Sequence, residues 1–549
     1  MRTIDVMAQI LKKEGVQFLS AFPTTPVIEA CAEAGIRPVI CRQERVGVGI
    51  ADGFTRVTNA NPPGAFAMQY GPGAENAYAG VATAFSDAVP MLLLPLGHPR
   101  HQDGIFPHFS SLRNYAPITK HIEQVNSPER IAPALRRAFA AMKMGRPGPA
   151  MVEIPVDIAT SQADSALAEN YQPVKRTMSQ GNPDDVLAAA KALLKAKAPV
   201  IHAGQGVLYA DATNELIELA ELLQVPVVTT MAGKSGFPEG HPLALGSVST
   251  TMNGAAYSFL KNADLVFAIG SSLTKHAMTT HIPAGKTIIH ATNDSIDISK
   301  DYVVDYPVIG DARLVLRQFI EACKDLLGKK SRNGKTEAEV AKARQAWLKE
   351  WNPRLTSSEV PISPYRVIHE FMQAVKPSEA IMTHDSGSPR DQIMPFYKSD
   401  GPRTYIGWGK SHGLGTGLGL IMGAKMAQPE KFCVNLMGDA AFGMVGTDFE
   451  TAARSGIPIC TIVLNNSSMA CETDAMAASH RLYNARDLGG NYADMASAMG
   501  GWSERVTDPG KIAGAIKRAR KATEGGKAAL LEFITKQETQ TSHKRAFQG

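Results

Sequence analysis

Short apolar runs, each followed by an amphipathic segment, recur along the whole of this 549-residue chain. The run at 199–203 leads into a glycine turn in this way, and the run at 434–437 leads into another. Such alternation is typical of parallel strands joined by crossover helices. At roughly 100–200 residues per domain, a chain of this length holds about three such units. We therefore expect an α/β fold made of three doubly wound parallel-sheet domains.

The chain divides at two polar stretches that carry no strand pattern. A proline-containing stretch at 161–183 separates the first unit from the second, and a charged stretch at 329–350, largely helical after Gly334, separates the second from the third. The expected strands include 65–69, 91–96, 265–270, 432–437 and 459–464, and the expected helices include 4–14, 44–55, 127–142, 418–426 and 448–455. The expected parts are an N-terminal domain at 1–165, a central domain at 185–325, a linker at 326–360 and a C-terminal domain at 361–549.

The charge and the cysteine content exclude several classes of partner. Lys and Arg total 57 against 52 for Asp and Glu, so the net charge of +5 is too small to indicate nucleic-acid binding. No stretch reaches the roughly 20 apolar residues of a membrane span, and the N-terminus lacks the apolar core of a signal peptide. The six cysteines form no CxxC pair and mostly lie in apolar runs, as buried thiols do. We expect a cytoplasmic protein that acts on a small molecule, without nucleic-acid or membrane partners.

An acid and an amide follow two of the expected strands in the third domain. Asp439 follows the strand at 432–437, and Asn466 follows the strand at 459–464. A crossover helix fits between them, so the two side chains should lie at neighbouring strand tips. A carboxylate, an amide oxygen and a loop carbonyl offer hard oxygen ligands to Mg²⁺, whose shell phosphate and water oxygens then complete. The alternative is structural: Asp439 caps the following helix, and Asn465-Asn466 makes a turn.

The spacing from Gly438-Asp439-Ala440 to Asn465-Asn466 resembles the GDG…NN diphosphate-anchoring motif of thiamine-diphosphate (ThDP) enzymes. The overall pattern is similar to that of the acetohydroxyacid synthase/pyruvate oxidase superfamily, over nearly the whole chain. The resemblance implies a pyrimidine-binding domain, a central nucleotide-binding-like domain and a diphosphate-binding domain, in that order. It makes Asp439, Asn466 and the backbone carbonyl of Ser468 the metal ligands. The neighbouring residues expected to line the cofactor are Gly438, Ala440, Ala441 and Met469.

Glu44 begins a run of small apolar residues in the first domain, so its helix is expected to be buried. A buried carboxylate needs a partner, or its pKa rises. By the resemblance, that partner is the aminopyrimidine ring, with which Glu44 shares a proton and so promotes removal of the thiazolium C2 proton. Gly71-Pro72 and Asn76 resemble the family's turn beside that ring, and Leu414 matches the apolar residue that props the cofactor in its V shape. Simple turn and packing roles are the alternatives for these residues.

Three histidines mark a departure from the family pattern. Pro107 and His108 stand where many members carry Gln and Glu, which leaves the natural substrate open. His98, His101 and His108 share one loop near the expected active-site face, and His108 is the best candidate for carrying protons in catalysis. A surface or structural role is the alternative for each of them.

The central domain resembles a module that holds FAD in some members and ADP in others. An arginine that often follows its second glycine turn is missing, and Ser271-Ser272 stands there instead. The sequence therefore leaves two alternatives for this module: it binds FAD or ADP, or it is unoccupied.

Glu44 and Asp439 lie in different domains, so one cofactor must bridge two of them. In the family these domains come from different subunits, which implies a homodimer at least, and a tetramer is common in relatives. The implied activity is ThDP- and Mg²⁺-dependent formation or cleavage of a C–C bond next to a carbonyl, as in an acetolactate-synthase-like carboligase acting on 2-oxo acids or acyl donors. A 2-oxo-acid decarboxylase or a 2-hydroxyacyl lyase is the alternative within this chemistry. A non-catalytic regulatory paralogue is the alternative outside it, although the joint presence of Glu44, Asp439 and Asn466 argues against that class.

Overall fold

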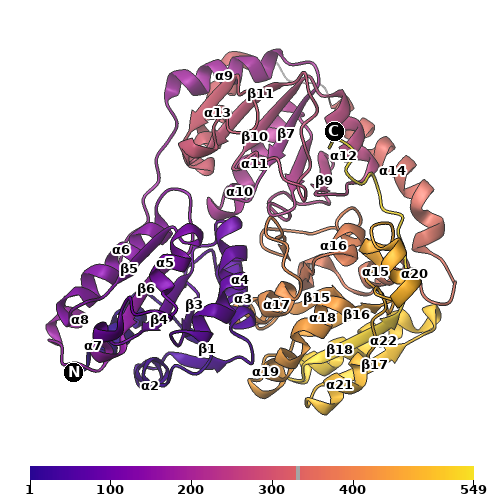
Figure 1. The fold of residues 1–549 in the computed structure, drawn as a ribbon. Helices are drawn as coiled ribbons and strands as arrows, with labels where there is room; N and C mark the ends of the chain where they lie inside the picture. The colour runs from indigo at the N-terminus through magenta and orange to yellow at the C-terminus, as the bar shows by residue number, and fades with distance from the viewer. Residues whose placement is uncertain (329–333, 549) are drawn as a thin grey trace.

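A computed structural model describes residues 1–328 and 334–548 of the chain. Figure 1 shows three α/β lobes in chain order, with the central lobe above the N-terminal and C-terminal lobes. Each lobe is built on one six-stranded sheet. Neighbouring strands are parallel throughout these sheets, and helices flank each of them. The expected fold of three parallel-sheet α/β domains is confirmed.

The N-terminal sheet has the strand order β2-β1-β3-β4-β6-β5. Its innermost strands are buried along their whole length, which is why they read as continuous apolar runs in the sequence. The strands are β1 (Phe18–Ala21), β2 (Arg37–Ile40), β3 (Ala65–Met68), β4 (Leu92–Gly97), β5 (His121–Gln124) and β6 (Ala150–Pro155). The helices are α1 (Thr3–Lys13), α2 (Thr25–Glu33), α3 (Glu44–Thr58), α4 (Pro72–Ser86), α5 (Ser111–Tyr115), α6 (Ile131–Lys143), α7 (Val156–Ala159) and α8 (Ala166–Glu169).

The central sheet has the order β12-β11-β10-β7-β8-β9, so the chain reverses direction of winding between β7 and β10. A ligand crevice is expected at such a switch point, beyond the carboxyl ends of the strands. The strands are β7 (Pro199–Ala203), β8 (Val227–Thr230), β9 (Ala244–Val248), β10 (Leu265–Ile269), β11 (Thr287–Thr292) and β12 (Tyr306–Ile309). The helices are α9 (Pro183–Lys195), α10 (Gly206–Tyr209), α11 (Thr213–Leu223), α12 (Gly254–Asn262) and α13 (Ala312–Leu327).

The C-terminal sheet has the order β14-β13-β15-β16-β18-β17, which places β15 beside β16. The strands are β13 (Ala380–His384), β14 (Tyr405–Ile406), β15 (Phe432–Gly438), β16 (Cys460–Asn465), β17 (Trp502–Val506) and β18 (Ala529–Ile534). The helices of this part are α15 (Pro364–Ala374), α16 (Ser388–Ile393), α17 (Thr416–Ala427), α18 (Asp439–Val445), α19 (Phe449–Arg454), α20 (Ala477–Tyr483), α21 (Tyr492–Ala498) and α22 (Ile512–Glu524). The carboxyl ends of β15 and β16 carry the residues singled out by the sequence.

The segment expected to be a linker contains one long helix, α14 (Lys335–Leu355), while its part at 329–333 lies outside the described residues. Val340 packs into the central-domain core, whereas Trp347 and Trp351 pack into the core of the C-terminal domain. Because α14 buries side chains against both domains, it packs them together and is not a free linker between them.

Helices α3 and α17 pack tightly against each other where the N-terminal and C-terminal lobes meet (Figure 1). A Cβ on Gly53 would lie 2.0 Å from the carbonyl oxygen of Leu420, and a Cβ on Gly423 would lie 2.1 Å from that of Ile50. These are clashes with backbone, which cannot swing away as a side chain can. Glycine at these positions therefore sets the approach of the two lobes.

We expect Gly53→Ala to lower the free energy of unfolding by about 1–3 kcal/mol, because the new methyl group overpacks the crossing. The matched control is Gly514→Ala in α22, where the nearest atom to a new Cβ is the mobile end of Arg518 at 3.2 Å. Alanine there should be neutral, or stabilising by about 0.5–1 kcal/mol. The midpoint of urea denaturation, measured in parallel for both variants, tests the difference. Equal midpoints would show that the α3–α17 crossing tolerates a methyl group.

Five of the six cysteines are buried, as expected, whereas Cys471 is exposed. Among the helices that the structure describes, none combines the length and the apolarity that a membrane crossing requires.

Candidate active site

Asp439 and Asn466 lie at neighbouring strand tips, as the sequence spacing predicts. Strands β15 and β16 pair with Gly438 opposite Leu464, so the residues that follow them share one edge of the sheet. Asp439 is the first residue of α18 and accepts a hydrogen bond from its neighbour's amide, Ala440 N, at 2.9 Å. Backbone amides of the loop 466–468 also point toward its carboxylate. The structural alternative holds in part, because a carboxylate in the first turn of α18 complements the helix dipole.

Two buried polar atoms at this edge lack partners among the described residues: Asp439 Oδ2 and Ser468 Oγ. Asp439 is only 3% exposed. Burial raises the pKa of its carboxyl group, and the surrounding backbone amides oppose that rise without cancelling it. A bound cation would supply the missing partner for this oxygen. The donor set therefore fits the Mg²⁺ of a diphosphate cofactor, a hard ion that takes carboxylate and amide oxygens.

The other residues expected around the diphosphate follow the same two strands but differ in burial and in their hydrogen bonds. Ala440 is partly exposed, so its methyl group does not close the turn, and Ala441 is fully buried in the core. The Asn466 side-chain oxygen accepts from Ser468 N at 3.0 Å, which orders the loop that would carry the third ligand. Met469 is partly exposed just beyond it.

Glu44 lies at the N-terminus of α3 and is 3% exposed, which confirms that its helix is buried. Burial raises the pKa of the Glu44 carboxyl group, opposed by hydrogen bonds from its own backbone and from the Asn76 side chain. Gly71, with φ +65°, lets the chain turn into α4, and Pro72 begins that helix. A Cβ on Gly73 would lie 3.5 Å from Glu44 Oε1, so this glycine keeps the space beside the carboxylate open.

The backbone of Leu414 is held beside α3. Its carbonyl oxygen accepts from Arg45 Nη2 at 2.6 Å, and its side chain is partly exposed. The next turn is fixed by Asp385, whose carboxylate accepts from Gly415 N at 2.8 Å and from Gly417 N at 2.9 Å. Burial raises the pKa of Asp385 to about 6. The sequence analysis missed Asp385, although this acid directly follows β13 as Asp439 directly follows β15.

Within one chain, no hydrogen bond or ion pair among the described residues joins Glu44 to Asp439. The N-terminus of α3 instead meets the far end of α18: Gln43 Nε2 donates to Met444 O at 3.3 Å, and Gln43 N donates to Asp448 at 3.1 Å. At 1.5 Å per residue, the seven-residue helix α18 separates its two ends by roughly 9 Å. Glu44 and Asp439 thus make no direct contact within one chain, which is also what two groups at opposite ends of one cofactor would show.

Two of the three loop histidines stack on each other. The His98 and His108 ring centroids lie 4.4 Å apart at 6°, and Tyr70 lies 4.5 Å from His98 on the side of the Gly71 turn. Burial, and then the neighbouring His108, lower the pKa of His98. His101 is exposed. The sequence placed all three histidines on one loop, but it carried no signal for the stack or for Tyr70.

Comparisons with known proteins agree with this geometry. Three thiamine pyrophosphate enzyme models match the chain: the N-terminal TPP binding domain at 1–125, the central domain at 186–319 and the C-terminal TPP binding domain at 385–533. Acetolactate synthase isozyme 3 large subunit of Escherichia coli is 30% identical over 490 residues, covering 84% of this chain and 82% of that protein. A probable acetolactate synthase large subunit of Methanocaldococcus jannaschii is 29% identical, covering 94% and 90%. An acetolactate synthase of Arthrospira platensis is 30% identical, covering 88% and 85%.

Three parallel-sheet domains with a carboxylate in the first and an oxygen-rich strand edge in the third define a thiamine-diphosphate-dependent enzyme. The chain belongs to the thiamine pyrophosphate enzyme family, in the acetohydroxyacid synthase/pyruvate oxidase superfamily.

Proposed function

We propose that this chain is an acetolactate-synthase-like carboligase that acts on 2-oxo acids with ThDP and Mg²⁺. The observation that carries the proposal is the unpartnered Asp439 Oδ2, buried at the strand edge that also holds Asn466 and Ser468. A buried carboxylate oxygen without a partner is costly unless a ligand completes it. The similarity to acetolactate synthases over most of the chain supports the reaction class.

Each half of the site has a distinct task in this proposal. Asp439 Oδ2, the Asn466 amide oxygen and the Ser468 carbonyl oxygen would hold Mg²⁺ and, through it, the diphosphate. When bound, the cofactor supplies an electron sink for the reacting carbonyl carbon. Glu44 would hold a proton on its carboxyl group against the pyrimidine ring, a task that suits a carboxyl whose pKa is raised by burial.

We propose His108 as the group that carries protons on the substrate side. It lies on the loop that follows β4, stacked on His98 and near the turn at Gly71. Imidazole is the side chain that most often transfers protons in catalysis. Its place on the N-terminal domain puts it on the same side of the site as Glu44.

We propose a homodimer as the minimum assembly, with a tetramer made of two such dimers as the larger form. Glu44 and Asp439 lie in different domains, and in the family these domains come from different subunits, so a second copy would complete two sites. Helix α4, which starts at the Gly71 turn, exposes Tyr78 and Phe85, each 37% exposed. Large apolar side chains on one face of a helix are typical of a covered interface.

Product analysis with pyruvate tests the proposal. The full chain, purified and supplied with ThDP and Mg²⁺, is expected to release acetolactate and CO₂. Acetaldehyde as the sole product would identify a decarboxylase instead. Bound ThDP without turnover of pyruvate would favour a lyase acting on a 2-hydroxyacyl compound. A protein that takes up no ThDP would contradict the proposal and favour the regulatory paralogue.

A further inference from the structure

A cavity of about 570 Å³ lies between the central domain and the two other domains. Its volume falls within the roughly 300–1,000 Å³ typical of small-molecule sites. Segments that follow the strands β7, β10, β11 and β12 line one side, where an open parallel sheet binds its ligand. Glycines bring these strand ends close: a Cβ on Gly204 would lie 2.3 Å from the carbonyl oxygen of Gly270. The crevice therefore fits the nucleotide that the family's central module holds.

One end of the cavity is formed by residues from outside the central domain. Lys410 reaches it from the segment after β14, and its Nζ donates to Ser272 Oγ at 2.9 Å. No carboxylate lies within 4.0 Å of this Nζ among the described residues, so the ammonium group has unused donors. Desolvation lowers the pKa of Lys410 to about 8, helped by the positive charges of Arg146 and Lys300 and opposed by Asp87 and Asp297.

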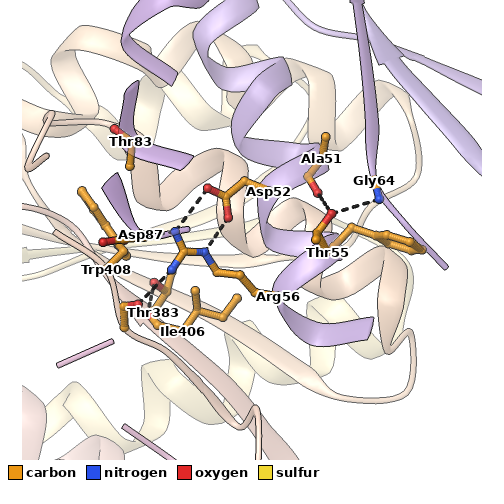
Figure 2. Close-up of polar contacts among 12 residues, drawn as sticks. Ala51, Asp52, Thr55, Arg56, Gly64, Thr83, Asp87, Thr383, Ile406 and Trp408 are labelled. Atoms are coloured by element: carbon orange, nitrogen blue, oxygen red, sulfur yellow. Dashed lines mark hydrogen bonds and ion pairs between the residues drawn. The ribbon is translucent and has the colours of Figure 1, made fainter. Parts of the chain in front are cut away.

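Asp87 supplies an unused acceptor at the same end. The residue is 1% exposed and lines the cavity, and its Oδ1 has no partner among the described residues. Its other oxygen, Oδ2, accepts from Arg56 Nη2 at 3.1 Å and from Gly409 N at 3.3 Å. Figure 2 shows Arg56 joined to both Asp52 and Asp87. Two carboxylates against one guanidinium leave a net negative charge, so a ligand group that donates is favoured at Oδ1.

We propose that Asp87 and Lys410 form a recognition pair for the ring of a nucleotide bound in this cavity. A ring N–H or amino group donates to Asp87 Oδ1, and a neighbouring ring nitrogen or oxygen accepts from Lys410 Nζ. Adenine and the flavin ring both carry a donor beside an acceptor on one edge. A phosphate offers only acceptor oxygens, so it cannot satisfy the unpartnered acceptor Asp87 Oδ1 as a ring N–H or amino group can. The pair therefore orients the ligand with its ring toward Lys410 and its phosphates toward the central strand tips.

This inference rests on the proposed function and adds to it a nucleotide bound in the central domain in one orientation. Its test measures ligand binding rather than turnover. ThDP- and Mg²⁺-loaded protein is titrated with FAD and with ADP in a calorimeter, alongside inorganic pyrophosphate as a probe without a ring. At least one nucleotide is expected to bind. Lys410→Met should weaken that binding by about 10- to 100-fold, because a hydrogen bond from a charged group is lost. Pyrophosphate binding should stay unchanged in this variant.

Two further variants keep the test decisive. Lys431→Met removes a lysine whose Nζ donates to the Ser378 carbonyl, away from the cavity lining, and should bind nucleotides like the wild type. Asp87→Asn should also weaken nucleotide binding, with thermal unfolding run beside it because Asp87 also holds Arg56. Unchanged nucleotide affinity in Lys410→Met, or no nucleotide binding to the wild type, would overturn the inference. So would a parallel loss of pyrophosphate binding, since Lys410 would then contact phosphate.

The same titrations separate this inference from the proposed function. ThDP uptake is measured first, in the absence of nucleotide. A protein that binds no ThDP but loses nucleotide affinity on Lys410→Met contradicts the carboligase and retains the recognition pair. The reverse pattern retains the carboligase and rejects the pair.

Discussion

Glu44→Gln is expected to lower turnover of pyruvate by about 10²–10⁴-fold, the usual contribution of a positioned acid–base group. Glutamine keeps the shape of the side chain and can still accept the Asn76 hydrogen bond, but it cannot hold or release a proton. ThDP should therefore remain bound while the chemistry fails. Circular dichroism of the bound cofactor and steady-state kinetics, measured on the same sample, report the two properties separately.

The control for this variant is Glu29→Gln, the same change on an exposed residue of α2 in the same domain. It should leave both turnover and ThDP binding unaltered. If Glu44→Gln retains wild-type turnover, the carboxylate takes no part in the reaction. If it loses ThDP altogether, Glu44 is an anchor for the cofactor rather than a proton carrier.

The pH dependence of the wild-type enzyme follows from the same burial. Because desolvation raises the pKa of Glu44, the carboxylate form is depleted at a higher pH than for an ordinary glutamate. The acidic limb of the kcat/KM profile should therefore lie above the usual glutamate range. That limb should disappear from the residual activity of Glu44→Gln.

The sequence located several strands whose burial is complete, although it missed β1, which is also fully buried. Strands β15 and β16 are buried nearly throughout and appear as unbroken apolar runs, so both were predicted within a residue or two of their observed bounds. β5 is only half-buried and β14 has two residues, so neither leaves a recognisable pattern. A hydrophobic pattern in the sequence indicates burial, so an edge strand can be predicted only where its side chains are buried.

Site residues could be predicted where they lie in one crossover unit, but not where they come together from different domains. Asp439 and Asn466 follow consecutive strands of one crossover unit, so strand-end geometry places them together from the sequence alone. Asp87 and Lys410 are more than 300 residues apart and come together only through the packing of three domains around the central cavity. No spacing rule links such residues, because the contact depends on how the α3–α17 crossing sets the lobes.

Asp439→Asn is expected to weaken the joint binding of ThDP and Mg²⁺ by about 10- to 100-fold or more, because it neutralises the carboxylate that would hold the metal. The same substitution should raise the stability of the protein without cofactor, which is the opposite of its effect on the cofactor-bound form. Burial raises the pKa of Asp439 in the folded state, so the folded state holds this proton more tightly than the unfolded chain does. The apo protein should therefore lose stability as the pH rises through that pKa, and asparagine should remove this loss.

Thermal unfolding at pH 7–8, with and without ThDP and Mg²⁺, reads both effects at once. At a ligand concentration of about 100 Kd, binding stabilises the wild type by about 2.7 kcal/mol, and this increment should largely vanish in Asp439→Asn. Without ligand, the variant should melt at or above the wild-type temperature. Asp400→Asn, the same change at an exposed site, should alter neither value. If ThDP and Mg²⁺ raise the unfolding temperature of Asp439→Asn as much as that of the wild type, the metal binds elsewhere. A carboxylate that holds Mg²⁺ cannot be neutralised without loss of that stabilisation.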